Sequence, residues 1–379
     1  MSTETLQYVK KVKAAVLHDF NQDLVIETVD QIAPRGNEIR VKLVSCGICH
    51  TENAYRTKLW NTPLKMPIVL GHEGAGYVDA VGPGVTKFKV GDKVAMTTPY
   101  CGYCDNCKKG RTWYCKNTVP LQIGGFDYYG TTPIALNGKP VHTMFNQSAL
   151  EEYTVLHINN CVKLPDDYDL KIAGPLGCGL RTGAGAVYNC LKPQVGEWVA
   201  IFGTGAVGLA SMWMAKAMGA RTILVDYNEK RLQEALELGG EKVVCTKDMK
   251  TSEEIADAVR ACAEGKEIPY AMEGTGNPMV HKAAMMSLTF GGHCAQVSNI
   301  NAISFNSYTK DCNDGKEITF VRMGNVDGEI IIPLMADMYL RGMFPYDKLL
   351  TFYKFEDINQ ALADHHAGKV FKPVILFGD

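Results

Sequence analysis

The spacing of apolar and polar positions predicts short β-strands in the first half of the chain. Apolar runs at residues 39–44, 74–81 and 92–96 are separated by glycine-containing turns at 81–84 and 90–92. Short strands bounded by such turns are typical of antiparallel sheets and barrels. We therefore expect a barrel-like β-region in this part of the chain.

The middle of the chain has a different pattern, in which apolar runs alternate with segments of helical length. The apolar runs lie at 198–202, 222–225, 243–245, 270–272 and 293–298. The helical segments between them lie at 206–218, 228–238, 252–263 and 278–288. This alternation implies βαβ units and a parallel sheet. Asn228 is placed to cap the second of these helices.

The last part of the chain continues with two helical patterns, at 330–340 and 356–365. An apolar run at 374–377 follows them. Because this tail comes after the alternating region, we expect it to return to the first domain and complete it.

Composition and charge exclude several classes of partner. The 379 residues include 39 Lys and Arg against 41 Asp and Glu, which gives a formal net charge of −2. This balance does not favour nucleic acid or an anionic membrane as a partner. No apolar run reaches the roughly 18 residues that a membrane helix needs, and the first residues lack the pattern of a secretory signal. We expect a cytoplasmic protein.

A glycine-rich turn follows the first apolar run of the alternating region. Gly203, Gly205 and Gly208 form GxGxxG between a predicted strand and a predicted helix, which is the context of a dinucleotide-binding turn. Asp226 ends the next predicted strand, where an acidic side chain accepts hydrogen bonds from an adenosine ribose and disfavours the 2′-phosphate of NADP. Arg231 nearby could flank the ribose of either cofactor. The alternative is an ordinary glycine-rich turn with a surface aspartate.

Cysteine is frequent, with 13 residues, and four cysteines fall within fifteen positions. An odd total argues against a fully paired disulfide framework. Four thiolates at this short spacing can close a tetrahedral zinc site that leaves no position open and is therefore structural. A nucleic-acid-binding zinc finger is the alternative, although the chain has no basic excess. The four are Cys101, Cys104, Cys107 and Cys115.

A second set of possible metal ligands is scattered along the chain. Cys49 lies in GICHTE, His72 and Glu73 lie in GHEG, and Cys178 lies in GCG. Two cysteines and a histidine would leave a fourth zinc position open for water or substrate. By themselves these residues are weak evidence, because chance cysteines in a cysteine-rich chain could supply them.

Taken together, these motifs resemble the zinc-containing medium-chain dehydrogenase/reductase family, which includes the alcohol dehydrogenases. The resemblance runs from about residue 13 to the end. Its markers are GICHTE at 47–52, GHEGAG at 71–76, VGDKV at 90–94, the four-cysteine segment, GCG at 177–179 and GTGAVG at 203–208. Stretches at 175–187, 344–349 and 357–369 are most similar to the aryl, or benzyl, alcohol dehydrogenases.

The resemblance implies a fold and a domain order. A GroES-like barrel catalytic domain at 1–179 would contain the structural-zinc lobe at 97–117. A Rossmann NAD-binding domain with a doubly wound parallel sheet would follow at 180–322, and residues 323–379 would return to the catalytic domain. The family also implies two zinc ions per subunit and NAD(H), with assembly as a homodimer or homotetramer.

The resemblance also assigns roles around the catalytic zinc. Cys49, His72 and Cys178 would bind the metal, and Glu73 would be an acid that can approach it. Glu52 would orient His72 through a hydrogen bond, a usual duty beside a metal ligand. Relatives more often carry aspartate at this position.

Further roles concern the proton and the cofactor. The hydroxyl of Thr51 would bind the substrate oxygen and relay its proton. Many relatives have a histidine three residues later as the terminal base, where this chain has Ala54, so we expect the path to end in water. Four residues would contact the cofactor: His50 and Lys372 near the pyrophosphate, and Thr182 and Val207 against the nicotinamide.

The sequence thus predicts a zinc-dependent, NAD-linked alcohol dehydrogenase or aldehyde reductase acting on a primary alcohol, aromatic or allylic by resemblance. One alternative is a family member that oxidises a polyol or a thiol adduct of formaldehyde. The other is a cofactor-binding homologue without turnover, for which the missing histidine gives slight support.

Overall fold

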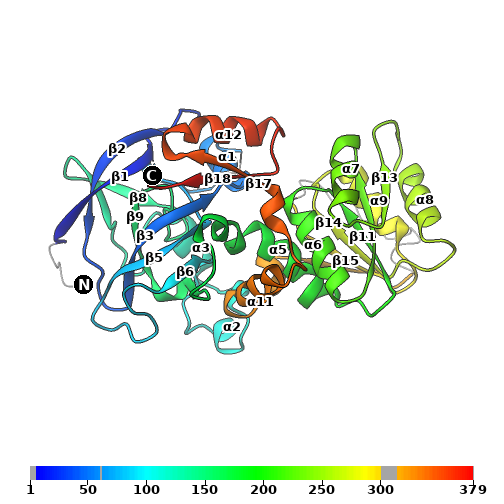
Figure 1. Cartoon of the computed structure of the whole chain (residues 1–379), viewed down its shortest axis with the longest axis horizontal. Coiled ribbons are helices and arrows are strands. Elements are labelled where there is room, and N and C mark those ends of the chain that lie inside the picture. The colour runs from blue at the N-terminus through cyan, green and yellow to red at the C-terminus, as the bar shows by residue number, and fades with distance from the viewer. Residues whose placement is uncertain (1–5, 60–61, 300–313, 379) are drawn as a thin grey trace. The chain divides into compact units, whose positions relative to one another are not determined.

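The computed structural model describes residues 6–59, 62–299 and 314–378, which form two compact units (Figure 1). The first unit comprises Met1–Cys178, Asp327–Ala336 and Asp347–Asp379, and the second comprises Gly179–Val326 and Asp337–Tyr346. Residues 323–326 and 337–346, which belong to the tail 323–379 that we expected to return to the first domain, group with the second unit. The chain enters each unit more than once.

A closed barrel forms one part of the first unit. Its strands follow one another in the order β1 (Tyr8–Leu17), β2 (Val25–Ile32), β7 (Ile134–Leu136), β8 (Lys139–Thr143) and β4 (Ile68–Val69). Asn137 and Gly138 join β7 to β8, with φ of 51° and 73°. Positive φ at both positions is what a tight two-residue hairpin turn requires.

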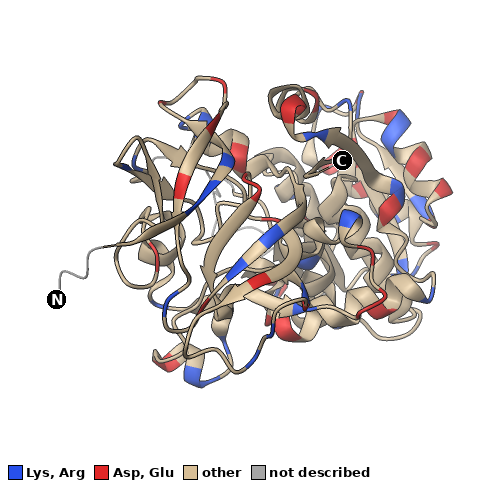
Figure 2. Cartoon of the chain, turned by 60° about the vertical axis from the view of Figure 1, so that its left-hand side comes forward, with Lys and Arg blue, Asp and Glu red and all other residues tan. Residues whose placement is uncertain are grey.

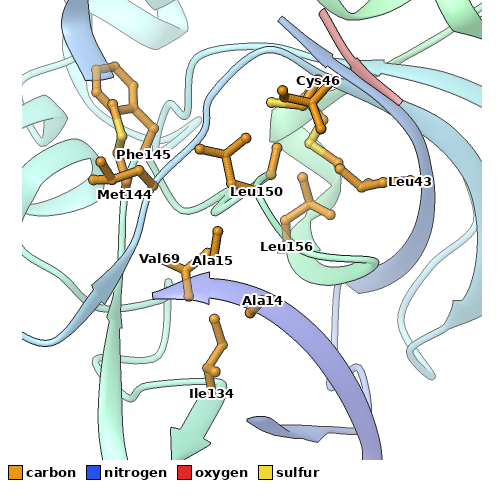
Figure 3. Packing of buried hydrophobic residues seen from close by; sticks show 14 of the residues in the cluster. Ala14, Ala15, Leu43, Cys46, Val69, Ile134, Met144, Phe145, Leu150 and Leu156 are labelled. Atoms are coloured by element: carbon orange, nitrogen blue, oxygen red, sulfur yellow. The ribbon is translucent and has the colours of Figure 1, made fainter. Parts of the chain in front are cut away.

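One continuous apolar core is shared by the barrel and the other sheet of the first unit (Figure 3). Ala14 and Ala15 on β1, Val69 on β4 and Ile134 on β7 are at most 1% exposed. Leu150 lies beside Ala15, whose backbone N–H donates to the carbonyl of Leu150 at 2.9 Å. Full burial of a leucine or isoleucine stabilises a fold by about 1.5–3 kcal/mol, so this core holds the barrel closed.

The other sheet of the first unit carries the strands next to the candidate metal ligands. Its order is β10 (Cys161–Lys163), β6 (Lys93–Met96), β5 (Gly74–Val81), β3 (Glu38–Gly47), β18 (Lys372–Leu376) and β17 (Leu350–Lys354), and β9 (Tyr153–His157) also pairs with β3. Strands β3, β5 and β6 correspond to the apolar runs that predicted strands. Since β18 runs antiparallel to β3 with Val374 opposite Gly47, the end of the chain lies beside the segment that leads to Cys49.

The second unit contains a six-stranded parallel sheet. Its order is β13 (Lys242–Cys245), β12 (Arg221–Asp226), β11 (Trp198–Phe202), β14 (Tyr270–Glu273), β15 (His293–Gln296) and β16 (Glu317–Phe320). In chain order this is 3-2-1-4-5-6, the Rossmann arrangement. The predicted doubly wound sheet is therefore confirmed. The strand order reverses between β11 and β14, which is where such sheets bind ligands.

Helices connect these strands as the periodicity predicts. They are α6 (Ala206–Ala217), α7 (Glu229–Glu237), α8 (Ser252–Cys262) and α9 (Pro278–Ser287). Asn228 caps α7 by accepting a hydrogen bond from the backbone N–H of Arg231. Helix α5 (Gly179–Gly185) packs on α6, and α8 packs on α9. All five residues of β11 are buried, as expected for a central strand covered on both faces.

The remaining helices are short apart from two. They are α1 (His50–Arg56), α2 (Asp105–Lys108), α3 (Thr118–Ile123), α4 (Leu170–Ala173), α11 (Gly328–Leu340) and α12 (Ile358–His366). Within the described ranges, every helix is too short or too polar to cross a bilayer. Basic and acidic residues are interspersed along the strands and helices (Figure 2).

Candidate active site

Four side chains from distant parts of the chain converge in the first unit. Cys49 precedes helix α1, His72 and Glu73 lie between β4 and β5, and Cys178 ends the first long segment of the unit. One ligand atom from each lies within 4.8 Å of the others. The folded chain thus assembles two thiols, an imidazole and a carboxylate, a donor set suited to zinc.

The carboxylate of Glu52 connects two of these ligands. Its Oε2 accepts a hydrogen bond of 2.9 Å from the backbone N–H of Cys49, which completes a capping box at the start of α1. Its Oε1 pairs with Nδ1 of His72. The glutamate side chain is long enough to make both contacts.

The imidazole of His72 is held so that its other nitrogen faces the thiols. Nε2 is buried and has no hydrogen-bond partner among the described residues, whereas Nδ1 is occupied by Glu52. The ring of Phe145 stacks on the imidazole, with centroids 4.9 Å apart. An unpartnered buried nitrogen is costly unless it has a ligand, so the site fits a metal ion at this nitrogen.

The pKa values of the two half-buried thiols, Cys49 and Cys178, are shifted in opposite directions. A hydrogen bond from Cys178 lowers the pKa of Cys49 well below that of an ordinary thiol, in spite of burial. The same contact, together with burial, raises the pKa of Cys178. The lowered pKa of Cys49 favours its thiolate form, which is the form that binds a metal.

Glu73 is buried beside this cluster and is paired with Lys372. The ammonium of Lys372 lies 2.7 Å from Oε1 and 2.5 Å from Oε2 of Glu73, and it donates to the carbonyl of Ile48 at 3.0 Å. Burial raises the pKa of Glu73 to about 7, and Lys372 opposes this rise. A Cβ atom on Gly47 would lie 2.2 Å from Glu73 Oε2, so glycine is needed for the carboxylate to enter. We predicted Lys372 near a pyrophosphate, and the structure places its ammonium against Glu73.

The predicted relay residues lie on α1. Thr51 is half-buried, and its hydroxyl lies 3.7 Å from Sγ of Cys49. His50 is exposed at the first position of the helix. Ala54 is fully buried. Its side chain has no titratable group, so it cannot act as the terminal base of a proton relay.

The other four cysteines form a compact cluster elsewhere in the first unit. The sulfur atoms of Cys101, Cys104, Cys107 and Cys115 lie within 4.8 Å of one another. Cys107 Sγ is 3.9 Å from that of Cys101 and 3.5 Å from that of Cys104. Zinc–sulfur bonds of 2.3 Å in a tetrahedron place sulfur atoms about 3.8 Å apart, so these spacings fit one zinc ion.

Backbone groups prepare this cluster for a cation. The N–H of Cys101 donates to Cys115 Sγ at 3.3 Å, and the N–H of Cys104 donates to Cys101 Sγ at 3.4 Å. Hydrogen bonds from the backbone of Cys107 and Lys116 lower the pKa of Cys104 to about 6. All four positions are filled by sulfur, so the cluster could hold a metal but could not offer it to a substrate.

The glycine-rich turn of the second unit has the geometry that its sequence predicts. Gly203 adopts φ of 99°, in the region that favours glycine. A Cβ on Gly208 would lie 1.8 Å from the carbonyl oxygen of Gly203, so the third glycine allows helix and strand to pack closely. A Cβ on Gly205 would meet no atom within 4 Å, so this position faces open space at the start of α6.

That open space is a cavity of about 510 Å³ at the carboxyl ends of the strands. Gly203, Gly205, Asp226 and Arg231 line it, together with Val225, Tyr227, Thr246, Lys247, Met249, Gly274, Thr275, Asn277, Met279 and Val280. Its size and its place beside a helix N-terminus suit an anionic dinucleotide.

The carboxylate of Asp226 is fixed in the wall of this cavity. Oδ2 accepts hydrogen bonds of 2.8 Å from both the backbone N–H and the hydroxyl of Thr204. Oδ1 accepts one of 3.0 Å from the backbone N–H of Asn228. Val207 on α6 and Thr182 on α5 are half-buried in the same unit, but neither lines the cavity.

Two features of the candidate sites were not predicted from the sequence. The ion pair of Glu73 with Lys372 joins residues 299 positions apart, and no local pattern indicates it. The carboxylate of Glu273, at the end of β14, was not singled out either. Its signal was present, because an acidic residue ends a buried central strand directly before Gly274 and Gly276.

The chain matches two known domain families. Residues 35–166 match the alcohol dehydrogenase GroES-like domain, and residues 206–332 match the zinc-binding dehydrogenase domain.

Similar whole proteins are also known. Geraniol dehydrogenase of Castellaniella defragrans is 35% identical over 96% of this chain and 97% of its own length. S-(hydroxymethyl)glutathione dehydrogenase of Komagataella pastoris is 32% identical over 99% of both chains. The crystal structure of benzyl alcohol dehydrogenase from Acinetobacter calcoaceticus superposes with a TM-score of 0.90 at 34% identity, covering 98% of this chain and all of that chain.

Two glycine substitutions test whether close packing in the glycine-rich turn contributes to the stability of the protein. We expect Gly208→Ala to destabilise the protein by about 3 kcal/mol or more, because the new methyl group would overlap a backbone oxygen. Gly205→Ala is the matched control and should cost about 1 kcal/mol or less, since its methyl group faces open space. Chemical denaturation measures both, and equal costs would contradict this account of the turn.

Proposed function

Because this chain belongs to the zinc-containing medium-chain dehydrogenase/reductase family, among its alcohol dehydrogenases, we propose that it uses zinc and NAD to interconvert a primary alcohol and its aldehyde. The observation that carries the proposal is the meeting of Cys49, His72 and Cys178 around one point. Three such ligands leave a fourth position for substrate, as in catalytic zinc sites.

The protein side chains prepare this position for chemistry. A zinc ion bound there would act as a Lewis acid on the substrate oxygen. Glu52 keeps His72 in the orientation that presents Nε2. Lys372 balances the charge of Glu73, so the carboxylate can remain next to the two thiols without leaving an unpaired buried charge.

Thr51 is the group that we assign to proton transfer. Its hydroxyl lies at the edge of the cluster, 3.7 Å from Cys49 Sγ, and can both accept and donate a proton. Ala54 cannot continue the transfer. We infer that the proton passes from Thr51 to water.

The cavity of the second unit is proposed to take NAD. Asp226 places a carboxylate in its wall, which suits the hydroxyls of an adenosine ribose and opposes a 2′-phosphate. Arg231 and Lys247 line the same cavity and bring positive charge for the pyrophosphate or the ribose. Val207, Thr182 and His50 remain proposed cofactor contacts.

The proposed substrate is an aromatic or allylic primary alcohol. Two relatives with full-length similarity are named for geraniol and for benzyl alcohol. A second candidate is a thiol adduct of formaldehyde, because another relative is named for S-(hydroxymethyl)glutathione. We also propose two zinc ions per subunit and a cytoplasmic homodimer or homotetramer.

A substrate panel tests the proposed reaction. NADH formation should be fastest with benzyl alcohol or geraniol, with kcat/KM at least about tenfold above that for ethanol, because larger apolar groups contribute more binding energy. Absorbance at the NADH band measures it. A preference for S-(hydroxymethyl)glutathione would favour the second candidate, and no turnover with any substrate would contradict an enzyme.

Removing one ligand from each cysteine cluster tests the two zinc assignments. Cys49→Ala should lose one of two zinc ions and reduce kcat at least about a thousandfold, because Lewis-acid catalysis supplies several kcal/mol. Cys104→Ser, the matched control, should also lose one zinc ion. It should lower the thermal midpoint of the protein, while the folded fraction keeps most of its activity. Metal analysis with steady-state kinetics reports both. Full activity of metal-verified Cys49→Ala would remove this residue from the proposed site.

Cofactor preference tests the role of Asp226. Asp226→Gly should raise the ratio of kcat/KM for NADP to that for NAD by at least about tenfold, because a negative charge near the 2′-phosphate is removed. Glu237→Gln removes an acid from the last turn of α7 that does not line the cavity, and should leave the ratio unchanged. An unchanged ratio in Asp226→Gly would refute the assignment.

A further inference from the structure

Glu273 is a fully buried carboxylate at the end of the central strand β14. Among the described residues, no Lys or Arg is recorded within ion-pair distance of it. A buried charge without a cation is stable only when hydrogen bonds satisfy it. The donors around Glu273 therefore show what this side chain holds in place.

One carboxylate oxygen binds the loop that follows the strand. Oε1 accepts hydrogen bonds from the backbone N–H of Thr275 at 2.7 Å, from the hydroxyl of Thr275, and from the backbone N–H of Gly276 at 3.2 Å. Gly276 has φ of 72°, so the loop turns sharply over the carboxylate. The hydroxyl of Thr275 then accepts from the N–H of Asn277 at 3.1 Å.

The other oxygen is anchored to the neighbouring strand. Oε2 accepts from the side-chain amide of Gln296 at 2.5 Å and from the hydroxyl of Ser298 at 2.7 Å. The oxygen of the Gln296 amide in turn contacts Nδ1 of His281 on α9 at 2.5 Å. Loop 274–277 is thus tied through Glu273 to β15 and α9.

The loop held in this way is part of the dinucleotide cavity. Gly274, Thr275 and Asn277 line it together with Gly203. Thr275 Cγ2 would lie 3.2 Å from a Cβ on Gly203, so the loop packs directly against the first glycine of the turn. The N–H of Gly274 donates to the carbonyl of Phe202 at 2.9 Å, which joins the two strand ends where the sheet order reverses.

We propose that Glu273 is a positioning residue for the cofactor, which acts by holding residues 274–277 as a fixed wall of the cavity beside the glycine turn. This assignment rests on the proposed function, in which that cavity takes NAD(H). Glu273 does not line the cavity itself, so its effect on binding passes through the loop. A loop fixed before the cofactor arrives need not be ordered on binding, which improves affinity.

Glu273→Gln is the sharpest test, because it keeps the size of the side chain and removes one acceptor. The two loop N–H groups can only donate, and the N–H of Gly276 lies 3.2 Å from Oε1 and 3.3 Å from Oε2. Whichever way the new amide turns, its NH2 group therefore faces at least one of these donors. We expect the Kd for NADH and the KM for NAD to rise about tenfold, while kcat at saturating NAD and the KM for alcohol change by no more than about twofold.

Ser298→Ala is the matched control. It removes one donor to Oε2 and keeps every bond from Glu273 to the loop, so the Kd for NADH should stay within about twofold of wild type. Glu273→Asp keeps the carboxyl group on a shorter side chain, and the Kd of this variant for NADH should lie between those of wild type and Glu273→Gln. Should Glu273→Gln fail to fold, Glu273→Asp decides by the same readout.

Titration of NADH fluorescence on the full-length zinc-loaded protein, beginning with wild type, distinguishes the outcomes. A folded Glu273→Gln variant that binds NADH as tightly as wild type overturns the positioning role alone. A lower thermal midpoint with an unchanged Kd also overturns it, because the residue would then be only structural. If wild type itself does not bind NADH, the proposed function fails and this assignment fails with it.

Discussion

The carboxylate of Glu52 joins the start of helix α1 to the imidazole of His72, and the candidate metal centre depends on this link. One oxygen caps the helix at the N–H of Cys49, and the other occupies Nδ1 of His72. The same side chain thereby fixes the position of one thiol ligand and the orientation of the imidazole ligand. Without it, the His72 ring could turn its free nitrogen away from Cys49 and Cys178.

Two further buried carboxyl groups, those of Glu73 and Glu273, have different kinds of partner. The kind of partner matches the position of each group in the protein. Glu73 lies beside two thiols and a possible cation, and its partner is the ammonium of Lys372. Glu273 lies behind a loop, and its partners are neutral N–H and O–H donors. The ammonium of Lys372 can balance negative charge at the candidate metal centre. The N–H and O–H donors around Glu273 instead hold a backbone segment in one conformation and add no net charge to it.

Local patterns in the sequence predicted much of the second unit and the cluster of four cysteines, whereas the grouping of Cys49, His72 and Cys178 was implied only by the family resemblance. The GTGAVG turn specifies its own geometry, because Gly203 needs positive φ and Gly208 needs the absence of a side chain. Asn228 caps α7 as its position predicts. The four clustered cysteines lie within fifteen positions of the sequence, and the turns of this segment bring their sulfur atoms within 4.8 Å of one another. The family resemblance and the fold class are confirmed by the domain matches.

Pairing between strands and contacts between residues that are distant in the sequence could not be predicted from local patterns. Strands β1 and β2 escaped prediction because lysines and acids interrupt their apolar positions, and they are defined by pairing with each other. Lys372 reaches Glu73 only because β18 pairs with β3 in a register that no local pattern encodes. Residues 337–346 join the second unit for a similar reason, since their contacts are made with distant segments.

The most direct measurement of the central claim is zinc K-edge X-ray absorption of the purified protein, combined with anomalous diffraction to locate the ions. The account predicts one ion bound by four sulfur atoms and a second bound by Cys49, Cys178 and His72 Nε2, with a light atom completing its ligands. A single ion held only by the four clustered cysteines, or a second ion that lies away from His72, would contradict it.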